Sequence, residues 1–171
     1  MPFELQPTLE GKLLRLRPLR AEDWAALFAV AADPLIWSQH PAADRYREDV
    51  FREFFREAMA SGGALVVIDR RDERVIGSSR FLGYDEAASE IEIGYTFLAR
   101  SHWGGVYNRE MKELMLRHAL RQVKRVLFLV GPENWRSQKA MEKIGGVRAG
   151  SRVNGAGRES FVYEMTTLPA A

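Results

Sequence analysis

Two segments of the chain carry residue types that could bind a ligand and act on it. In residues 98–110 (LARSHWGGVYNRE), an apolar strand pattern runs into Gly104-Gly105, after which a helical pattern begins. Free N–H groups at a helix N-terminus attract anions, and glycines let a phosphate approach the backbone closely. The turn has neither the Gly-Lys-Ser/Thr of an NTPase loop nor the three spaced glycines of a dinucleotide fold. It therefore predicts an anion-binding turn, with an ordinary tight turn as the alternative.

The second segment, residues 130–146 (VGPENWRSQKAMEKIGG), follows a continuous apolar run. Asn134 is suited to cap a helix, and Ser137 lies one helical turn further on the same face. A lone asparagine and serine in this pattern are usually structural. The segment gains a functional interpretation only in combination with the first one.

Two carboxylates on one strand are candidates for a general base. Glu90 and Glu92 alternate with Ile91 and Ile93, so both side chains lie on one face of the predicted strand. A carboxylate there could act as a general base, although alternating glutamates usually form only a solvated face. No group of His, Asp and Glu residues has metal-ligand spacing, so we expect no metal site.

The composition limits the class of protein. The chain has 171 residues, of which 46% are apolar and 28% charged, as in one globular domain with its own core. The longest apolar run, residues 24–32, is too short to cross a membrane, and the first residues show no secretory signal. A cytoplasmic location is therefore expected. The absence of cysteine excludes disulfides and a thiol nucleophile, and a net charge of +2 with interleaved signs argues against a nucleic-acid surface.

Hydrophobic periodicity predicts the elements that position these residues. Alternating or continuous apolar runs indicate strands, and apolar residues three and four apart indicate helices. The order β-α-α-β-β-β-α-β-α-β-β predicts a single α/β domain on a mixed sheet, with an antiparallel meander in the middle. Strands are predicted at residues 12–19, 64–68, 75–84, 89–98, 126–130, 148–153 and 160–166, and helices at 21–33, 43–60, 107–122 and 134–144.

In this order and spacing, the two segments resemble the GNAT acyltransferase superfamily, specifically its RimJ/RimL-like branch. Residues 103–110 (WGGVYNRE) are similar to the coenzyme A pyrophosphate loop of that branch. Asn134-x-x-Ser137, followed by EKIG at residues 142–145, is similar to its second signature. The resemblance covers about residues 9–165, so residues 1–171 are interpreted as one N-acetyltransferase domain.

The loop departs from the usual superfamily pattern Gln/Arg-x-x-Gly-x-Gly/Ala. With Gly104 as the first glycine, Ser101 occupies the Gln/Arg position and Val106 the second small position, while Arg100 lies one residue early. The Asn-Arg-Glu that follows the loop indicates a variation within the branch.

The resemblance implies a fold and a reaction. In this family a mixed, mostly antiparallel sheet contains two central parallel strands that splay apart, here residues 90–98 and 126–130. The pantetheine arm of acetyl-CoA lies in the gap. An amine attacks the thioester directly, without a covalent enzyme intermediate, which is compatible with the lack of cysteine.

The resemblance also implies site residues. A backbone N–H near Tyr95 to Phe97 would stabilise the oxyanion, Ser137 would hydrogen-bond or protonate the leaving thiolate, and Asn134 would hold a pantetheine amide. For the base, Glu92, Glu90 and Glu159, an acidic position in members of the branch, remain alternatives. The residues expected to bind coenzyme A are Tyr95, Phe97, Arg100, Trp103, Gly104, Gly105, Val106, Asn108, Arg109, Asn134, Arg136 and Ser137. The residues expected to line the acceptor pocket are Trp37, His40 and Tyr84.

The leading hypothesis is transfer of an acetyl group from acetyl-CoA to a primary amine, which could be a protein N-terminus, an amino acid or another small amine. One alternative is a non-catalytic module that binds acyl-CoA and senses it. Another is a protein that binds an NTP or a dinucleotide. Acceptor walls are built from variable loops, so the resemblance fixes the donor rather than the acceptor. A homodimer is expected by analogy, and no nucleic-acid or membrane partner is expected.

Overall fold

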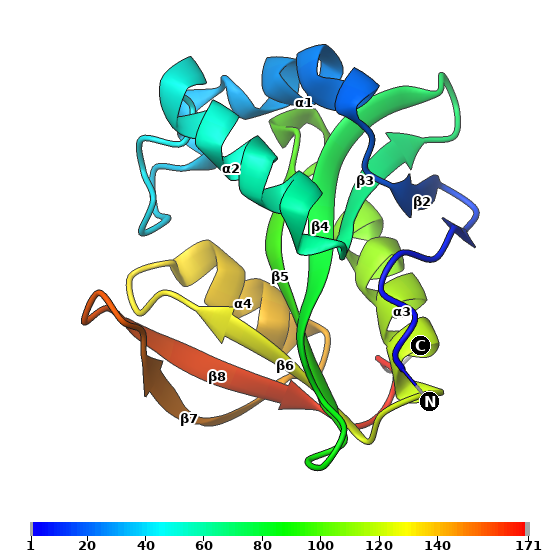
Figure 1. Cartoon of the computed structure of the whole chain (residues 1–171), viewed down its shortest axis with the longest axis vertical. Coiled ribbons are helices and arrows are strands. Elements are labelled where there is room, and N and C mark those ends of the chain that lie inside the picture. The colour runs from blue at the N-terminus through cyan, green and yellow to red at the C-terminus, as the bar shows by residue number, and fades with distance from the viewer. Residues whose placement is uncertain (1, 170–171) are drawn as a thin grey trace.

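The computed structural model describes residues 2–169, which form a mixed sheet with helices packed on both faces (Figure 1). The sheet has eight strands among these residues, in the order β1-β2-β3-β4-β5-β6-β8-β7, and only β5 and β6 are parallel neighbours. The strands are β1 (Leu9–Glu10), β2 (Leu14–Pro18), β3 (Ala64–Asp69), β4 (Arg74–Asp85), β5 (Glu90–Leu98), β6 (Arg125–Val130), β7 (Val147–Val153) and β8 (Glu159–Met165). The helices are α1 (Trp24–Ala31), α2 (Glu48–Ser61), α3 (Val106–Leu120) and α4 (Trp135–Lys143), with short 3-10 turns at Ala21–Asp23, Pro34–Ile36 and Arg100–His102.

Two hydrophobic clusters hold the layers together. One contains Met111 of α3 and Met141 of α4, which pack together with the sheet. The other contains Leu27 of α1 and Phe51 of α2, which cover the opposite face of the N-terminal half. The long strands β4 and β5 run between an upper part with α1 and α2 and a lower part with β6, β8 and α4 (Figure 1). Burial of these apolar faces is the main source of the fold's stability.

The parallel strands β5 and β6 separate after a short paired stretch. Their pairing ends at Glu92 and Leu127. Beyond these residues, β5 pairs with β4 and β6 pairs with β8. Just beyond this point, Tyr95 has a positive φ of 54°, and the pairing with β4 shifts between Ser78 and Arg80. An extra residue in one strand forms a β-bulge, a feature that is frequent next to active sites. The expected splay of two central parallel strands is therefore confirmed.

The structure differs from the sequence expectation at two places. The strand β1 was not predicted, because two residues are too short a run to show a period. The helix expected from residue 43 begins instead at Glu48, because Arg47 has an extended backbone and the preceding residues form turns. The predicted order of the other elements and the central meander are confirmed. Within residues 2–169, no helix combines the length and apolar character that a bilayer crossing requires.

Candidate active site

The glycine turn before α3 forms an anion-binding geometry. Gly104 and Gly105 have φ values of 116° and 109°, which side-chain-bearing residues rarely adopt. Gly105 directly precedes the helix, and the N–H groups of a first helical turn have no partner within the helix. The ammonium of Lys143 in α4 would lie 2.8 Å from a Cβ placed on Gly105. The helix N-terminus and this lysine therefore combine positive charge at one turn.

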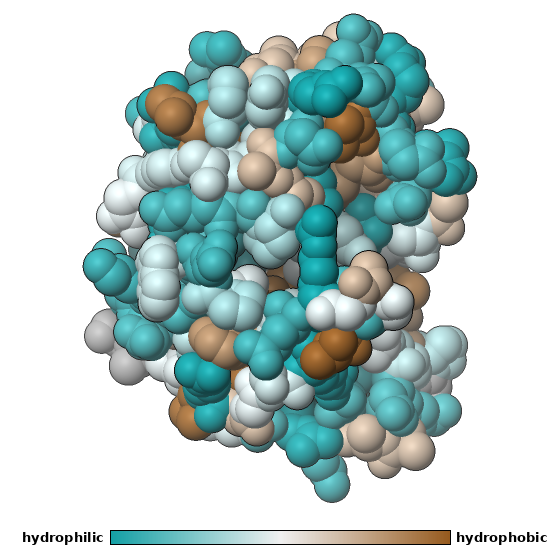
Figure 2. Space-filling model, turned by 90° about the vertical axis from the view of Figure 1, so that its left-hand side faces the viewer, coloured by the Kyte–Doolittle hydropathy of each residue, from teal (hydrophilic) through white to brown (hydrophobic). Residues whose placement is uncertain are grey.

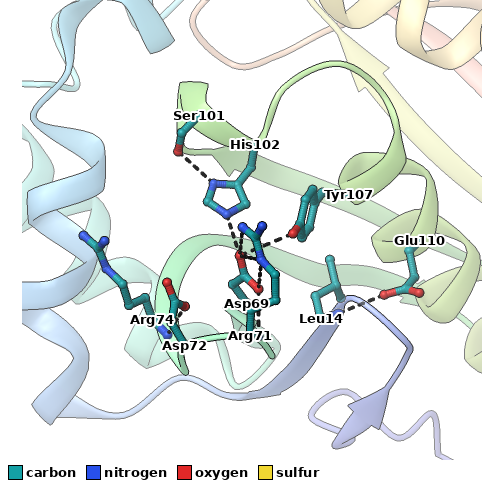
Figure 3. Close-up of polar contacts among 9 residues, drawn as sticks. All are labelled: Leu14, Asp69, Arg71, Asp72, Arg74, Ser101, His102, Tyr107 and Glu110. Carbon is teal, nitrogen blue, oxygen red and sulfur yellow. Dashed lines mark hydrogen bonds and ion pairs between the residues drawn. The ribbon is translucent and has the colours of Figure 1, made fainter.

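A buried carboxylate anchors this turn from both sides (Figure 3). Asp69, at the end of β3, is fully buried and lies 2.8 Å from Nε2 of His102, which precedes the glycines. The hydroxyl of Tyr107, which follows them, donates to the same carboxylate at 3.4 Å. Hydrogen bonds from Arg71, together with His102, hold the pKa of Asp69 well below its usual range. An ionised acid thus fixes the loop, although the sequence segment around Asp69 indicates only the end of a strand.

Replacing this carboxylate should weaken the fold and also the coenzyme A binding that the resemblance to the GNAT superfamily implies for this loop. Asp69→Asn presents an amide group to donors from Arg71 and His102, so we expect the free energy of unfolding to fall by about 2–4 kcal/mol. The loop should then lose its position and bind coenzyme A about tenfold more weakly. Urea unfolding and calorimetric titration with coenzyme A measure the two effects. Asp72→Asn is the matched control, because Asp72 is exposed and accepts a hydrogen bond from the backbone N–H of Arg74. An unchanged coenzyme A affinity in Asp69→Asn would show that the anchor does not position the loop.

A second contact joins the loop to α4. The indole N–H of Trp103 donates to the carbonyl of Leu98 at 3.0 Å, and the guanidinium of Arg136 stacks on the Trp103 ring at 3.8 Å. Arg136 also donates to the carbonyl of Ile36 at 3.1 Å, and burial lowers its pKa. The structure therefore brings Trp103 and Arg136 together, with the Arg136 side chain held by protein groups.

The first turn of α4 presents the second signature beside the splay. The buried side chain of Asn134 accepts a hydrogen bond from the backbone N–H of Ser137 at 3.3 Å, so it caps the helix as expected. Gln138 is also buried and donates to the carbonyls of Gly131 and Pro132, which fixes the turn after β6. Ser137 itself is half-buried. Because β6 leads directly into this turn, Asn134 and Ser137 border the gap from the β6 side.

The three candidate bases occupy different environments. Glu92 is half-buried, and its carboxylate lies along the strand, 3.0 Å from where a Cβ on Gly94 would be. Burial raises its pKa to about 7, although Arg152 opposes part of the shift. Glu90 is paired instead with Arg125 at 2.8 Å and with Arg152 at 3.7 Å. Glu159 is exposed at the start of β8, opposite Val153 in the hairpin.

Comparison with known proteins assigns the chain to a family. The profile of the acetyltransferase (GNAT) domain matches residues 14–147, which is most of the chain. The chain belongs to the GNAT acetyltransferase family. Among curated proteins, no sequence matches it significantly.

Solved structures share the fold of this GNAT protein. A GCN5-related N-acetyltransferase from Brucella melitensis is 22% identical, with a TM-score of 0.81, and the match covers 96% of this chain and 80% of that one. An acetyltransferase of the GNAT family from Bacillus anthracis is 21% identical, with a TM-score of 0.76 and coverages of 94% and 98%. Mycobacterium smegmatis RimJ, in complex with CoA-disulfide, is 21% identical, with a TM-score of 0.73 and coverages of 98% and 90%. Because the sequence identity is this low, the similarity to these structures shows a shared fold and nothing about a shared substrate.

Two of the three residues expected to line an acceptor pocket, Trp37 and His40, are neighbours in this GNAT domain. Trp37 is 2% exposed. Its ring centroid lies 5.1 Å from that of Phe97 and 5.5 Å from that of His40. Burial and nearby arginines lower the pKa of His40 to about 4, so the imidazole is neutral near pH 7. Tyr84 instead packs on Phe3 at 5.7 Å, in the cluster that contains α3. The structure therefore does not bring Tyr84 to Trp37 and His40.

The remaining expected coenzyme A residues lie around the start of α3. Val106 is exposed on the first turn, where Asn108 and Arg109 are half-buried. Arg100 forms an ion pair with Asp33 and lines an open depression of about 800 Å³ between α1 and the start of β4. The Arg100 guanidinium therefore points towards Asp33, which follows α1. The depression is lined by residues of α1 and β4, at a different place from the β5–β6 gap.

A buried lysine lies between the separating strands. The ammonium of Lys112, on α3, is 3.2 Å from the hydroxyl of Thr96 on β5 and 4.9 Å from the ring centroid of Phe128 on β6. Burial lowers its pKa to about 8. Sequence periodicity gave no signal for it, because a lysine in a helical pattern is usually exposed. Lys112 places a positive charge inside the gap.

Proposed function

We propose that this protein is an acetyl-CoA-dependent N-acetyltransferase of the RimJ/RimL-like branch, which transfers an acetyl group to a primary amine by direct attack. The observation that carries the proposal is the separation of β5 from β6 beside the turn of Gly104 and Gly105. A gap between parallel strands suits an extended arm, and an anion-binding turn suits a pyrophosphate. The acceptor is a protein N-terminus, an amino acid or another small amine.

The residues present fit coenzyme A. Backbone N–H groups at the start of α3, with Lys143 beside them, suit the pyrophosphate. The bulged part of β5 and the side chain of Asn134 border the gap that would receive the pantetheine arm. Bound acetyl-CoA supplies the acetyl group as a thioester.

The protein's own groups then manage charge and protons. Glu92 accepts the proton of the attacking amine. A carboxylate with a pKa of about 7 is a stronger base than a carboxylate with an unshifted pKa, and at pH 7 about half of it is ionised. A backbone N–H near Tyr95 donates to the carbonyl oxygen as it gains charge. As the N–C bond forms and the C–S bond breaks, the Ser137 hydroxyl donates a hydrogen bond to the thiolate. Glu92 is preferred to Glu90, which is held in ion pairs, and to the exposed Glu159.

Two measurements test this proposal. Calorimetric titration with coenzyme A should show saturable binding, and a thiol-release assay with acetyl-CoA should respond to at least one class in a panel of amines that includes N-terminal peptides. Absence of coenzyme A binding would contradict the proposal. Tight binding without thiol release from any amine would indicate a sensing module instead.

A further inference from the structure

Two arginines share a pair of aromatic rings on the acceptor side of the sheet. Arg80, on β4, is 6% exposed, and its guanidinium lies 4.0 Å over the ring of Tyr95 and 5.5 Å from the ring of Phe54. Arg45, from the loop before α2, lies 4.6 Å over Phe54 and 6.0 Å from Tyr95. The rings therefore hold two guanidiniums close to the bulge of β5.

Neither arginine has an acidic partner among residues 2–169. Within that range, no ion pair or side-chain hydrogen bond engages the guanidinium of Arg80 or Arg45, and Nε of Arg80 is buried without a hydrogen-bond partner. Burial lowers the pKa of both arginines, against a smaller opposing effect of Tyr95 and Glu57 on both and of Asp44 on Arg45. By contrast, the half-buried Arg17 forms two hydrogen bonds with Asp23. Two adjacent, partly desolvated like charges are unfavourable unless a ligand supplies the opposite charge.

Further cations extend this positive region. Arg45, Arg136 and Arg158 all lower the pKa of His40, so they surround the same loop. That loop and the tip of the β7–β8 hairpin lie on the left of Figure 1 and face the viewer in Figure 2, where hydrophilic residues dominate. A positively charged region attracts anions and repels cationic amines.

Arg80 and the proposed base lie on the same face of the sheet. Arg80 pairs across the strands with Gly94, and the carboxylate of Glu92 extends over Gly94 on the same face. Although both side chains belong to this face, no ion pair joins them, and the Arg80 guanidinium is directed to Tyr95. An acceptor could therefore place its amine near Glu92 and a negative group near the arginines.

We propose that Arg80 and Arg45 bind an oxyanion, a carboxylate or a phosphate, that the acceptor carries near its amine. The protein would then acetylate anionic amines and discriminate against neutral amines and polyamines. This inference rests on the proposed function, because it assumes that the acceptor lies on this face. The forked guanidinium suits carboxylates and phosphates equally, so the source of the oxyanion is left to the experiment.

Matched pairs of amines test the inference by direct binding. Calorimetry on the protein saturated with coenzyme A would compare free amino acids with their carboxamides, and phosphoethanolamine with ethanolamine. In at least one pair, the anionic member should bind about 10- to 100-fold more tightly, as expected for hydrogen bonds to a charged group. The pair that responds identifies the oxyanion. Equal binding within both pairs, or no binding of any anionic amine, would overturn the inference, while the coenzyme A titration alone decides the proposed function.

Variants separate a binding role from a packing role. Arg80→Gln and Arg45→Gln should each remove most of the preference for the anionic member and leave the affinity for coenzyme A within about twofold. Arg80→Gln should keep or raise the melting temperature, because a buried cation without a partner is lost. Arg52→Gln is the matched control, since Arg52 also stacks on a ring, Trp24, at 4.6 Å, but is paired with Glu48. A full preference retained in both Arg80→Gln and Arg45→Gln would assign the arginines to packing alone.

Discussion

Glu92→Gln is expected to lower kcat by about 10²- to 10⁴-fold, the range typical for loss of a general base. The glutamine has nearly the same shape and still fits over Gly94, so the acceptor and coenzyme A should bind as before. The loss should therefore be in kcat, with little change in KM. Stopped-time thiol-release assays at saturating acetyl-CoA, once an acceptor is found, measure it.

The pH dependence gives this prediction a second signature. Burial raises the pKa of Glu92 to about 7, and a base acts when deprotonated, so the wild-type rate should rise as the pH increases through about 7. In Glu92→Gln this rise should disappear from the remaining activity. Rates measured between about pH 5.5 and about pH 8.5, a range that extends more than one unit on both sides of the Glu92 pKa, would show the difference between the two proteins.

The same shift predicts a gain in stability for the inactive variant. Below pH 4.5 the carboxyl is protonated in both states, and as the pH rises towards 7 only the unfolded state ionises, so the wild type loses stability there. Well above pH 7 the penalty is constant and on the order of 3 kcal/mol, because the pKa rises from 4.5 to about 7 and one pKa unit corresponds to about 1.36 kcal/mol. Glu92→Gln avoids this penalty and should be the more stable protein at neutral pH. Urea unfolding at pH 5 and pH 8 measures the difference.

The other two carboxylates are the controls for Glu92. Glu90→Gln removes ion pairs with Arg125 and Arg152 and should affect stability more than kcat. Glu159→Gln changes an exposed group and should leave both nearly unchanged. A larger loss of kcat in Glu159→Gln than in Glu92→Gln would transfer the role of base to Glu159.

Most of the fold follows from local periodicity. The antiparallel meander, the buried strand β6 and the helices α3 and α4 have patterns of period 2 or 3.6 that no tertiary contact overrides. The start of α2 predicted at residue 43 is too early, because Arg47 is extended and the residues before it form a loop in which Arg45 packs on Phe54. A pattern of residue types does not distinguish a helical turn from a loop that packs on the same helix.

The site was predictable where its parts are contiguous in the chain. The turn of Gly104 and Gly105 and the cap of Asn134 are each formed within a few residues, so their sequence carries the geometry. By contrast, Asp69 meets His102 from 33 residues away, and Arg80 meets Arg45 through the rings of Phe54 and Tyr95, which come from other elements. Tyr84, which is expected in the acceptor pocket, packs instead against the cluster on the other face of the sheet. Long-range contacts of polar residues leave no periodic signal.

Ser137→Ala should lower kcat by about 10- to 100-fold and leave the affinity for coenzyme A nearly unchanged. A hydrogen bond to a charged group contributes about 1.5–3 kcal/mol, and here it would form fully only as the thiolate develops. The substitution spares the helix cap, because the backbone N–H of Ser137, rather than its hydroxyl, donates to Asn134. Alanine also favours a helix more than serine does, so the fold should not weaken. Single-turnover thiol release and coenzyme A titration measure the two quantities.

Two further variants distinguish a catalytic hydroxyl from a structural one. Ser137→Thr keeps a hydroxyl and should recover part of the rate, whereas a purely structural serine would not show this rescue. Asn134→Ala removes the cap and should lower the free energy of unfolding by about 1 kcal/mol and weaken coenzyme A binding, with a smaller effect on kcat. Although the two residues are three positions apart on one helical turn, we expect them to have different roles. Ser137 acts on the leaving thiolate, and Asn134 holds coenzyme A. Equal kcat in Ser137→Ala and the wild type would leave the thiolate to solvent and remove Ser137 from the mechanism.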